Sequence, residues 1–278
     1  MREQVAEFGH GSSLGVITEP DGDWRSRPAF VFLSSGILHR VGPNRLHVSI
    51  ARDLAKLGFL SFRIDFSGIG DSAAVSGNAS IAERWVADTR QAMDYLREQL
   101  GAKRFVLVGN CSGAAIAGLT ADVDPRVAGT VLINLQGPSI YLRYYLKLAC
   151  RTPAIWLRLL KGRARYGEAL AALKGYLASL RRQGDQADTI SPEVDVDAAL
   201  RNMAQRRTKM LIVYCAWDAG FDYYRVDLKR KIEEIMPAEL VRLEIIEGVD
   251  HDFKLLRGQL DLRRVVLDWA GQLQSAAY

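Results

Sequence analysis

One short turn in the sequence has residue types and a spacing suited to nucleophilic chemistry. Gly109-Asn110-Cys111-Ser112-Gly113 places a cysteine midway between two glycines, after an apolar run (RFVLV) and before a run of small residues (AAIAGLTA). A strand that turns sharply into a helix through such a residue is a nucleophile elbow. The glycines are needed because a Cβ beside the strained central residue would collide with the strand or the helix. The pattern predicts Cys111 as a nucleophile.

The expected place of Cys111 at a helix N-terminus supports this chemistry. Helix N-termini favour the reactive thiolate form of cysteine, and the backbone N–H of Ser112 would face an oxyanion formed there. Two alternatives stay open. Cys111 could be a small buried hydrophobic residue, as free cysteines often are, or Ser112 could be the nucleophile. The glycine spacing is symmetric about Cys111 and asymmetric about Ser112, so Cys111 is favoured.

An acid and then a histidine should follow the elbow along the chain. Asp218 follows the apolar run MLIVYCA, at the carboxyl end of an expected strand, where the sites of α/β proteins assemble. Asp222 is the reserve candidate, and helix capping is the alternative role for Asp218. His251 comes directly after the last expected strand, in EGVDHDF. We expect His251 to take and return the Cys111 proton while Asp218 fixes its tautomer.

A second oxyanion donor should come from the loop after the apolar run PAFVFLS. The backbone N–H of Ile37 is the leading candidate, with Leu38 next, and an ordinary turn is the alternative. His39, Arg40 and Arg45 lie in the same loop. His39 and Arg40 are predicted to bind substrate at the mouth of the pocket, where they would meet an anionic group. A solvated loop explains them equally well.

The elements that must position these residues alternate between short apolar runs and longer periodic ones, which is typical of a parallel sheet covered by helices on both faces. Ser80 and Glu83 form an S-x-x-E capping box that should open a helix reaching Leu100. Strands are expected at 28–34, 59–65, 104–109, 126–135, 210–216 and 240–247, and helices at 44–57, 81–100, 114–121, up to 236 and up to 274.

The alternation breaks at residues 136–209, which hold aromatic and basic helical stretches and no apolar strand. The economical interpretation is one sheet, formed by residues 1–135 and 210–278, with a helical insertion. The insertion contains 14 Lys and Arg against 6 Asp and Glu, so it carries +8 while the remainder of the chain carries −3. Such a surface could steer an acidic carrier protein or an anionic acyl donor. Amphipathic helices whose Lys and Arg cover an apolar underside are the alternative.

The composition excludes several classes. The 278 residues, with 49% hydrophobic and 25% charged residues and a net charge of +5, indicate a globular protein rather than a fibrous or disordered one. No long run of like charges suggests nucleic-acid binding. Three cysteines are an odd number, which favours a reducing compartment over a disulfide framework. The N-terminus does not resemble a signal peptide and no apolar stretch could span a membrane, so a cytoplasmic location is expected.

These motifs, in this order, resemble the α/β-hydrolase superfamily: VFLSSG, RIDFSGIGDS, VLVGNCSGAA, DPRVAGTVLIN, IVYCAWDAG and EGVDHDF. The resemblance runs from about Pro28 to Gln274. It implies an α/β-hydrolase fold, a Cys111, His251 and Asp218 triad, oxyanion donors at Ser112 and Ile37, and a cap formed by residues 136–209. No cofactor and no metal are expected.

The chain departs from the usual superfamily pattern by having cysteine where serine is common. Cysteine variants resemble dienelactone hydrolases and acyl- or aminoacyl-transferases. Acylation of Cys111 makes a thioester, which retains the transfer potential of a thioester donor. We therefore expect acyl transfer or hydrolysis on ester or thioester substrates through an acyl-cysteine, with an acidic carrier protein as a possible donor. The alternative is a catalytically silent binding or scaffold protein with the same fold.

Overall fold

The computed structural model describes residues 1–9, 13–137 and 195–274. Within them, eight strands form one sheet in the order β1-β2-β4-β3-β5-β6-β7-β8. The six strands from β4 to β8 in this order run parallel, while β1 and β2 form an antiparallel hairpin joined to β4. The strands are β1 (Arg2–Phe8), β2 (Ser13–Glu19), β3 (Ala29–Leu33), β4 (Ser61–Ile64), β5 (Phe105–Asn110), β6 (Val127–Ile133), β7 (Lys209–Cys215) and β8 (Val241–Ile246).

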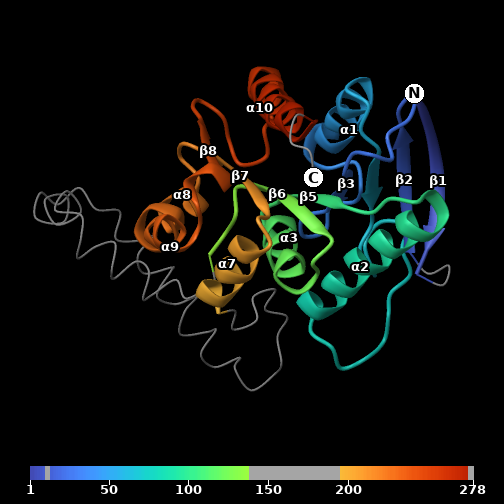
Figure 1. Cartoon of the computed structure of the whole chain (residues 1–278), viewed down its shortest axis with the longest axis horizontal. Helices are drawn as coiled ribbons and strands as arrows, with labels where there is room; N and C mark the ends of the chain where they lie inside the picture. The colour runs from blue at the N-terminus through green and yellow to red at the C-terminus, as the bar shows by residue number, and fades with distance from the viewer. Residues whose placement is uncertain (10–12, 138–194, 275–278) are drawn as a thin grey trace, which may run out of the picture. The chain divides into compact units, whose positions relative to one another are not determined.

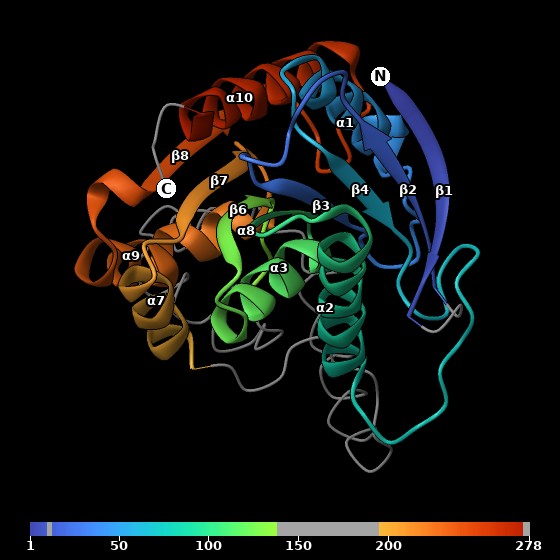
Figure 2. The same cartoon turned by 45° about the vertical axis from the view of Figure 1, so that its right-hand side comes forward.

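Helices cover both faces of this sheet. Figures 1 and 2 show α1 and α10 on one face and α2, α3 and α7 on the other. The α-helices are α1 (Leu46–Lys56), α2 (Ile81–Leu100), α3 (Ser112–Val123), α7 (Val196–Gln205), α8 (Ala219–Tyr223), α9 (Lys229–Ile235) and α10 (Leu256–Gln274). Short turns η1 (Pro43–Arg45) and η3 (Ala238–Leu240) and the π-helical stretch η2 (Tyr224–Leu228) complete the described elements.

One buried core cluster lies on one face of the sheet, between the sheet and the helices α1 and α10. Alternate residues of β5, Val106 and Val108, point to this face, because successive side chains of a strand point to opposite faces. They share one buried cluster with Ile50 of α1 and Trp269 of α10. Both faces of the central strands are buried, which explains their continuous apolar runs. This packing fixes the sheet edge at which the chemistry-bearing residues lie.

The expected fold class is confirmed: the sheet is mostly parallel and has helices on both faces. The capping box is also present, since the Ser80 side chain accepts from the Glu83 N–H and the Glu83 side chain accepts from the Ser80 N–H. The N-terminal hairpin was not expected from the sequence. Its outer strand, β1, is half exposed and has only Ala6 and Phe8 buried, so it lacks the apolar run that reveals the central strands.

The chain divides into two compact units, one of Met1–Gln136 with Pro192–Tyr278 and one of Gly137–Ser191. The predicted cap, residues 136–209, therefore extends further at its C-terminal end than the second unit does. Helix α7 belongs to the first unit, where the Asn202 side chain donates to Asp122 of α3 at 2.7 Å. Residues 138–194, with the basic and aromatic positions of the predicted cap, lie outside the described residues.

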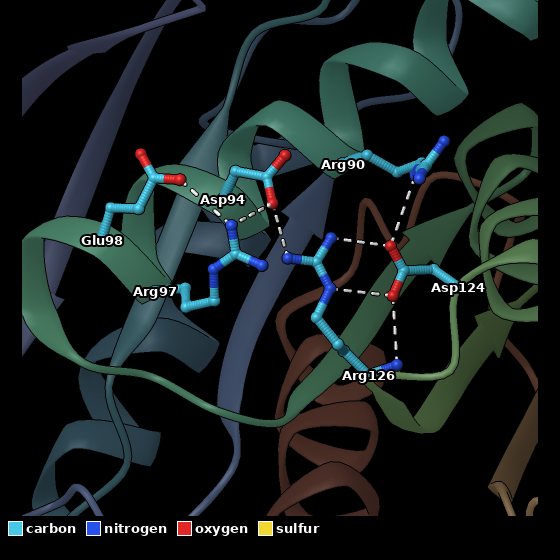
Figure 3. Close-up of polar contacts among 6 residues, drawn as sticks. All are labelled: Arg90, Asp94, Arg97, Glu98, Asp124 and Arg126. Atoms are coloured by element: carbon cyan, nitrogen blue, oxygen red, sulfur yellow. Dashed lines mark hydrogen bonds and ion pairs between the residues drawn. The ribbon is translucent and has the colours of Figure 1, made fainter.

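An ion-pair network ties α2 to the turn between α3 and β6 (Figure 3). Asp124 accepts from the Arg126 guanidinium at 2.7 and 2.9 Å and from Arg90 at 3.3 Å. Arg126 reaches Asp94 of α2 at 2.6 Å, and Arg97 approaches the same carboxylate at 3.3 Å. The Asp124 side chain is only 3% exposed. Burial alone would raise its pKa, but the hydrogen bonds from Arg126 outweigh this and lower it.

We expect Arg126→Met to lower the free energy of unfolding by about 2 kcal/mol, because it removes both guanidinium donors from a buried carboxylate. Arg97→Met is the matched control, since Arg97 is 49% exposed and exposed pairs contribute at most about 1 kcal/mol. Urea unfolding of both variants measures the difference. Equal losses in the two variants would show that the Asp124 contacts have no special weight.

Candidate active site

Cys111 stands at the turn between β5 and α3, in backbone geometry that side chains rarely adopt. Its φ is 53° and its ψ is −116°. A Cβ at Gly109 would lie 2.1 Å from the Gly113 carbonyl oxygen, and one at Gly113 would lie 2.6 Å from the carbonyl oxygen of Ser34. Only glycine fits at either position, so both glycines are needed for this turn. The thiol is partly exposed and not paired in a disulfide.

His251 and Asp218 are brought together from separate loops. Asp218 follows β7 and His251 follows β8, so both lie at the same sheet edge as Cys111. The Nδ1 atom of His251 lies 2.5 Å from Oδ2 of Asp218. His251 therefore pairs with Asp218 and not with the reserve candidate Asp222, which lies within α8.

Further hydrogen bonds fix the Asp218 carboxylate. Its Oδ1 atom accepts from the Gly220 N–H at 2.8 Å and from Nε2 of Gln136 at 2.9 Å. Burial alone would raise the pKa of Asp218, but the hydrogen bond from His251, together with these donors, lowers it. Asp218 also caps α8 through the Gly220 contact, so the capping role and the histidine contact coexist. The carboxylate stays charged and holds the imidazole ring.

The imidazole of His251 is held in its protonated form. The hydrogen bond to Asp218, followed by the interaction with Cys111, raises its pKa to about 10, against a smaller opposing effect of burial. An imidazolium beside a thiol favours the thiolate, which is the nucleophilic form of cysteine. The three side chains can therefore support attack by sulfur and protonation of a leaving group.

The loop after β3 is bonded to the elbow. The Gly36 N–H donates to Oγ of Ser112 at 2.8 Å, so the Ser112 hydroxyl accepts from a loop that lies 76 residues earlier in the chain. The Leu38 N–H donates to the Ser35 carbonyl and is thereby used within the turn. The N–H of Ile37 has no partner in the described part of the chain. Of the two predicted donors in this loop, Ile37 is the one left available for an oxyanion.

Arg40 and His39, the predicted substrate contacts, have different surroundings. The Arg40 guanidinium pairs with buried Asp65 and with Asp71, the latter at 2.6 Å. The Arg40 N–H also donates to Asp65. These contacts tie the loop after β3 to the loop after β4, which suits a loop-holding role better than a substrate contact. His39 is exposed, and its Cβ lies against Gly70; its role as a substrate contact stays a prediction.

Three residues beneath the acid and base were missed as site residues. Asn134 and Gln136 follow β6, and Cys215 ends β7; the sequence analysis gave them no role. Asn134 donates to the His251 carbonyl and Gln136 to Asp218. Positions just after a parallel strand are a general signal for site residues, but an amide there does not reveal which partner it will meet.

Within the described ranges, no group of three or more His, Cys, Asp or Glu side chains is placed to hold a metal ion. None of the helices in these same ranges combines the length and the apolar character that crossing a membrane requires. The basic surface predicted for residues 136–209 falls mostly outside these ranges, so docking of an acidic carrier stays a prediction.

A parallel sheet with an elbow after β5 and an acid and a histidine after β7 and β8 defines the α/β-hydrolase class. The chain belongs to the family described as serine aminopeptidase, S33, whose model matches residues 29–208. That match contains the elbow, where this chain has Cys111, and ends before Asp218 and His251. No curated protein matches the chain significantly.

Solved structures share the fold over nearly the whole chain. The α/β hydrolase GrgF from Penicillium sp. sh18 is 18% identical, with a TM-score of 0.64, covering 99% of this chain and 100% of that one. Est1E from Butyrivibrio proteoclasticus, solved with ferulic acid bound, is 12% identical with a TM-score of 0.62, covering 98% and 100%. Proline iminopeptidase from Mycobacterium smegmatis is 15% identical with a TM-score of 0.60, covering all of both chains.

Proposed function

We propose that this protein is an acyl-transfer enzyme that forms an acyl-Cys111 intermediate from ester or thioester donors. The observation that carries the proposal is the linked set of side chains at the elbow. Cys111 has the strained geometry of a nucleophile, its thiol contributes to the raised pKa of His251, and the Nδ1 atom of His251 lies 2.5 Å from Asp218. Membership of a hydrolase family supports acyl chemistry in general.

In the first half-reaction the Cys111 thiolate attacks the acyl carbon, and a carbon–sulfur bond forms as the carbonyl electrons move to oxygen. The N–H groups of Ser112 and Ile37 donate to this oxyanion; Ser112 is the first residue of α3, where N–H groups lack intrahelical partners. The intermediate then collapses, the bond to the leaving oxygen or sulfur breaks, and the His251 imidazolium gives that atom its proton.

In the second half-reaction an acceptor attacks the thioester. Neutral His251 takes the acceptor's proton, the acyl group leaves Cys111, and the thiolate and imidazolium are restored. Water as acceptor gives hydrolysis, whereas a thiol, amine or alcohol gives transfer. A thioester retains enough transfer potential for all of these acceptors.

The cysteine favours ester and thioester donors over amides. A tetrahedral intermediate expels its better leaving group, and a thiolate leaves more easily than an amine. Collapse of an amide-derived intermediate therefore returns the substrate more often than it forms the acyl-enzyme. A reactive free thiol also suits a reducing compartment, and we place the enzyme in the cytoplasm on this ground.

Intact-protein mass spectrometry after mixing with short acyl-thioesters tests the proposal. We expect a mass gain of one acyl group in the wild type and in Ser112→Ala, and no gain in Cys111→Ala. Ser112→Ala loses the acceptor for the Gly36 N–H, so its acylation should be about tenfold slower, as expected for one lost hydrogen bond.

Two results would contradict this assignment. An adduct that survives in Cys111→Ala but vanishes in Ser112→Ala would make Ser112 the nucleophile. The absence of any adduct or turnover with activated esters and thioesters, in folded protein, would favour the silent binding protein instead.

A further inference from the structure

We propose that Asn134 is a positioning residue that sets the place of His251 relative to Cys111, with Cys215 as a second contact on the same loop. The inference rests on the proposed function, because it concerns the histidine that serves Cys111. Asn134 and Cys215 belong to neighbouring strands, β6 and β7, and the loop they hold follows the next strand, β8. Figure 2 shows these three strands side by side.

Every polar group of the Asn134 side chain is used, and the residue is fully buried. Its Nδ2 atom donates to the His251 carbonyl oxygen at 3.1 Å and approaches Sγ of Cys215 at 3.3 Å. Its Oδ1 atom accepts from the Cys215 N–H at 2.9 Å. Its backbone φ is 47°, a left-handed conformation that asparagine tolerates better than most residues. The side chain thus bridges the end of β7 and the residue that carries the imidazole.

Cys215 holds the residue before His251. Its Sγ atom lies 3.2 Å from the Asp250 carbonyl oxygen. Burial raises the pKa of this thiol to about 11, so it keeps its proton at neutral pH and acts as the donor. The sequence indicates no role for Cys215, whereas the structure gives it a polar contact on the loop of His251.

Gln136 connects this contact to the acid. Its Nε2 atom donates to the Asn134 carbonyl oxygen at 3.2 Å and to Oδ1 of Asp218 at 2.9 Å. The amides of Asn134 and Gln136 therefore fix the backbone of the base and the carboxylate of the acid from one short segment after β6. Neither amide contacts the thiol of Cys111 among the described contacts, so their effect on it passes through His251 and Asp218.

Buried Val249 and the bond from Asn44 to the Asp252 carbonyl oxygen hold the loop on either side of the histidine. Among the described contacts, the hydrogen bond to the backbone of His251 itself comes from Asn134. Glu247, Gly248 and Asp250 are exposed, and His251 itself is partly exposed. Buried Phe253 anchors the far side of the loop, with its N–H donating to Asp250. Without the bond to its carbonyl, His251 would be placed by these neighbours in the loop and by its ring contacts.

The experiment measures alkylation of Cys111 by iodoacetamide against pH, with the modified residue identified by peptide mass spectrometry. The rate reports the thiolate held by the His251 imidazolium and needs no acyl donor. Asn134→Gly keeps the left-handed backbone and removes the side chain. Asn134→Asp keeps the shape and the acceptor for Cys215 but cannot donate to His251. We expect both to raise the pH midpoint of alkylation by about one unit, which corresponds to the loss of about one hydrogen bond.

Asn202→Gly is the matched control. It removes an amide that donates to Asp122 at 2.7 Å and places glycine inside a helix, so it destabilises the fold away from the site. We expect its alkylation profile to equal that of the wild type. Cys215→Ala should raise the pH midpoint of alkylation by less than the Asn134 variants do. Cys215→Ser keeps a donor for the Asp250 carbonyl oxygen and should have the midpoint of the wild type.

Unchanged midpoints in folded Asn134→Gly and Asn134→Asp would overturn the proposal. So would a shift in Asn134→Asp alone, which would mark a charge effect, or an equal shift in Asn202→Gly, which would mark general loosening. Failure of the proposed function would give a different result, namely the absence of an acyl adduct in the wild type. The alkylation profiles remain informative in that case.

Discussion

We expect His251→Gln to slow acylation of Cys111 by about 10²- to 10⁴-fold, the range typical of a general acid–base group. Glutamine cannot become a cation, so the leaving group loses its proton donor and the thiolate loses its counter-ion. Stopped-flow mixing with a chromogenic acyl-thioester measures the first turnover directly. Glu239→Gln is the control, because Glu239 is exposed and lies in η3, before β8, whereas His251 follows that strand.

The pH profile of the wild type should follow the same histidine. The raised pKa of His251, about 10 against an ordinary 6.5, keeps the imidazolium protonated at neutral pH. The rate of acylation should therefore hold through neutral pH and fall as the pH rises through about 10. The same linkage stabilises the fold fully below pH 6.5, and this contribution is lost as the pH rises through about 10.

Asp218→Asn tests whether the fall in acylation rate at high pH, the basic limb of the pH profile, is caused by deprotonation of His251. The hydrogen bond from Asp218 is the largest cause of the raised His251 pKa, so its loss should move the limb toward pH 6.5. Asp222→Asn should leave the limb in place, because Asp222 lies outside the pair. If the basic limb moves equally in both variants, Asp218 has no specific effect on the pKa of His251.

The second large effect is expected at His47, which lies inside α1 and is 1% exposed. Neither ring nitrogen has a hydrogen-bond partner in the described part of the chain. Burial, reinforced by the positive charge of Arg63, lowers the pKa of His47 to about 4 from an ordinary 6.5. The ring packs against Phe32, with the ring centroids 5.4 Å apart.

This lowered pKa should make the fold sensitive to acid. In the unfolded chain His47 gains a proton below pH 6.5, whereas in the folded chain it resists protonation until about pH 4. The free energy of unfolding should therefore fall between these two values by about 3 kcal/mol from this residue, with the contribution fully present only above pH 6.5.

His47→Phe should remove that part of the acid dependence and leave an aromatic ring against Phe32. Urea unfolding at pH 7, 5.5 and 4 measures the difference between the variant and the wild type. His39→Gln is the control, because it removes a histidine that is exposed. If the wild type and His47→Phe lose stability in parallel, protonation of His47 is not the cause.

The elbow could be predicted from sequence because its two glycines stand at a recognisable spacing about Cys111. A Cβ at Gly109 would collide with Gly113, four positions on, whereas one at Gly113 would collide with Ser34, just after β3. The spacing is local even though the second collision is not. The capping box at Ser80 and the central strands are local in the same sense. Runs of buried apolar residues and a capping box whose two partners stand three positions apart leave a pattern that can be recognised in the sequence.

The contacts beneath the site could not be predicted in this way. Asn134 meets the backbone of a residue 117 positions later, and Gln136 meets a carboxylate 82 positions later. Their partners depend on the neighbouring strands of the finished sheet. The contact of Arg40 could not be predicted for the same reason. Its partner Asp65 follows a different strand, and the two residues meet only where their loops lie together. The hairpin of β1 and β2 was missed because an edge strand buries too few residues to leave an apolar run.

The order of the strands also has a consequence for the growing polypeptide during translation. The thiol follows β5, while its base follows β8, the last strand of the sheet, 140 positions further along by residue number. Domains form as chains are synthesised, at about 5–20 residues per second. A ribosome-bound chain that lacks β8 thus carries the elbow cysteine without the histidine. Under the proposed function, acylation assisted by His251 requires that β8 has joined the sheet.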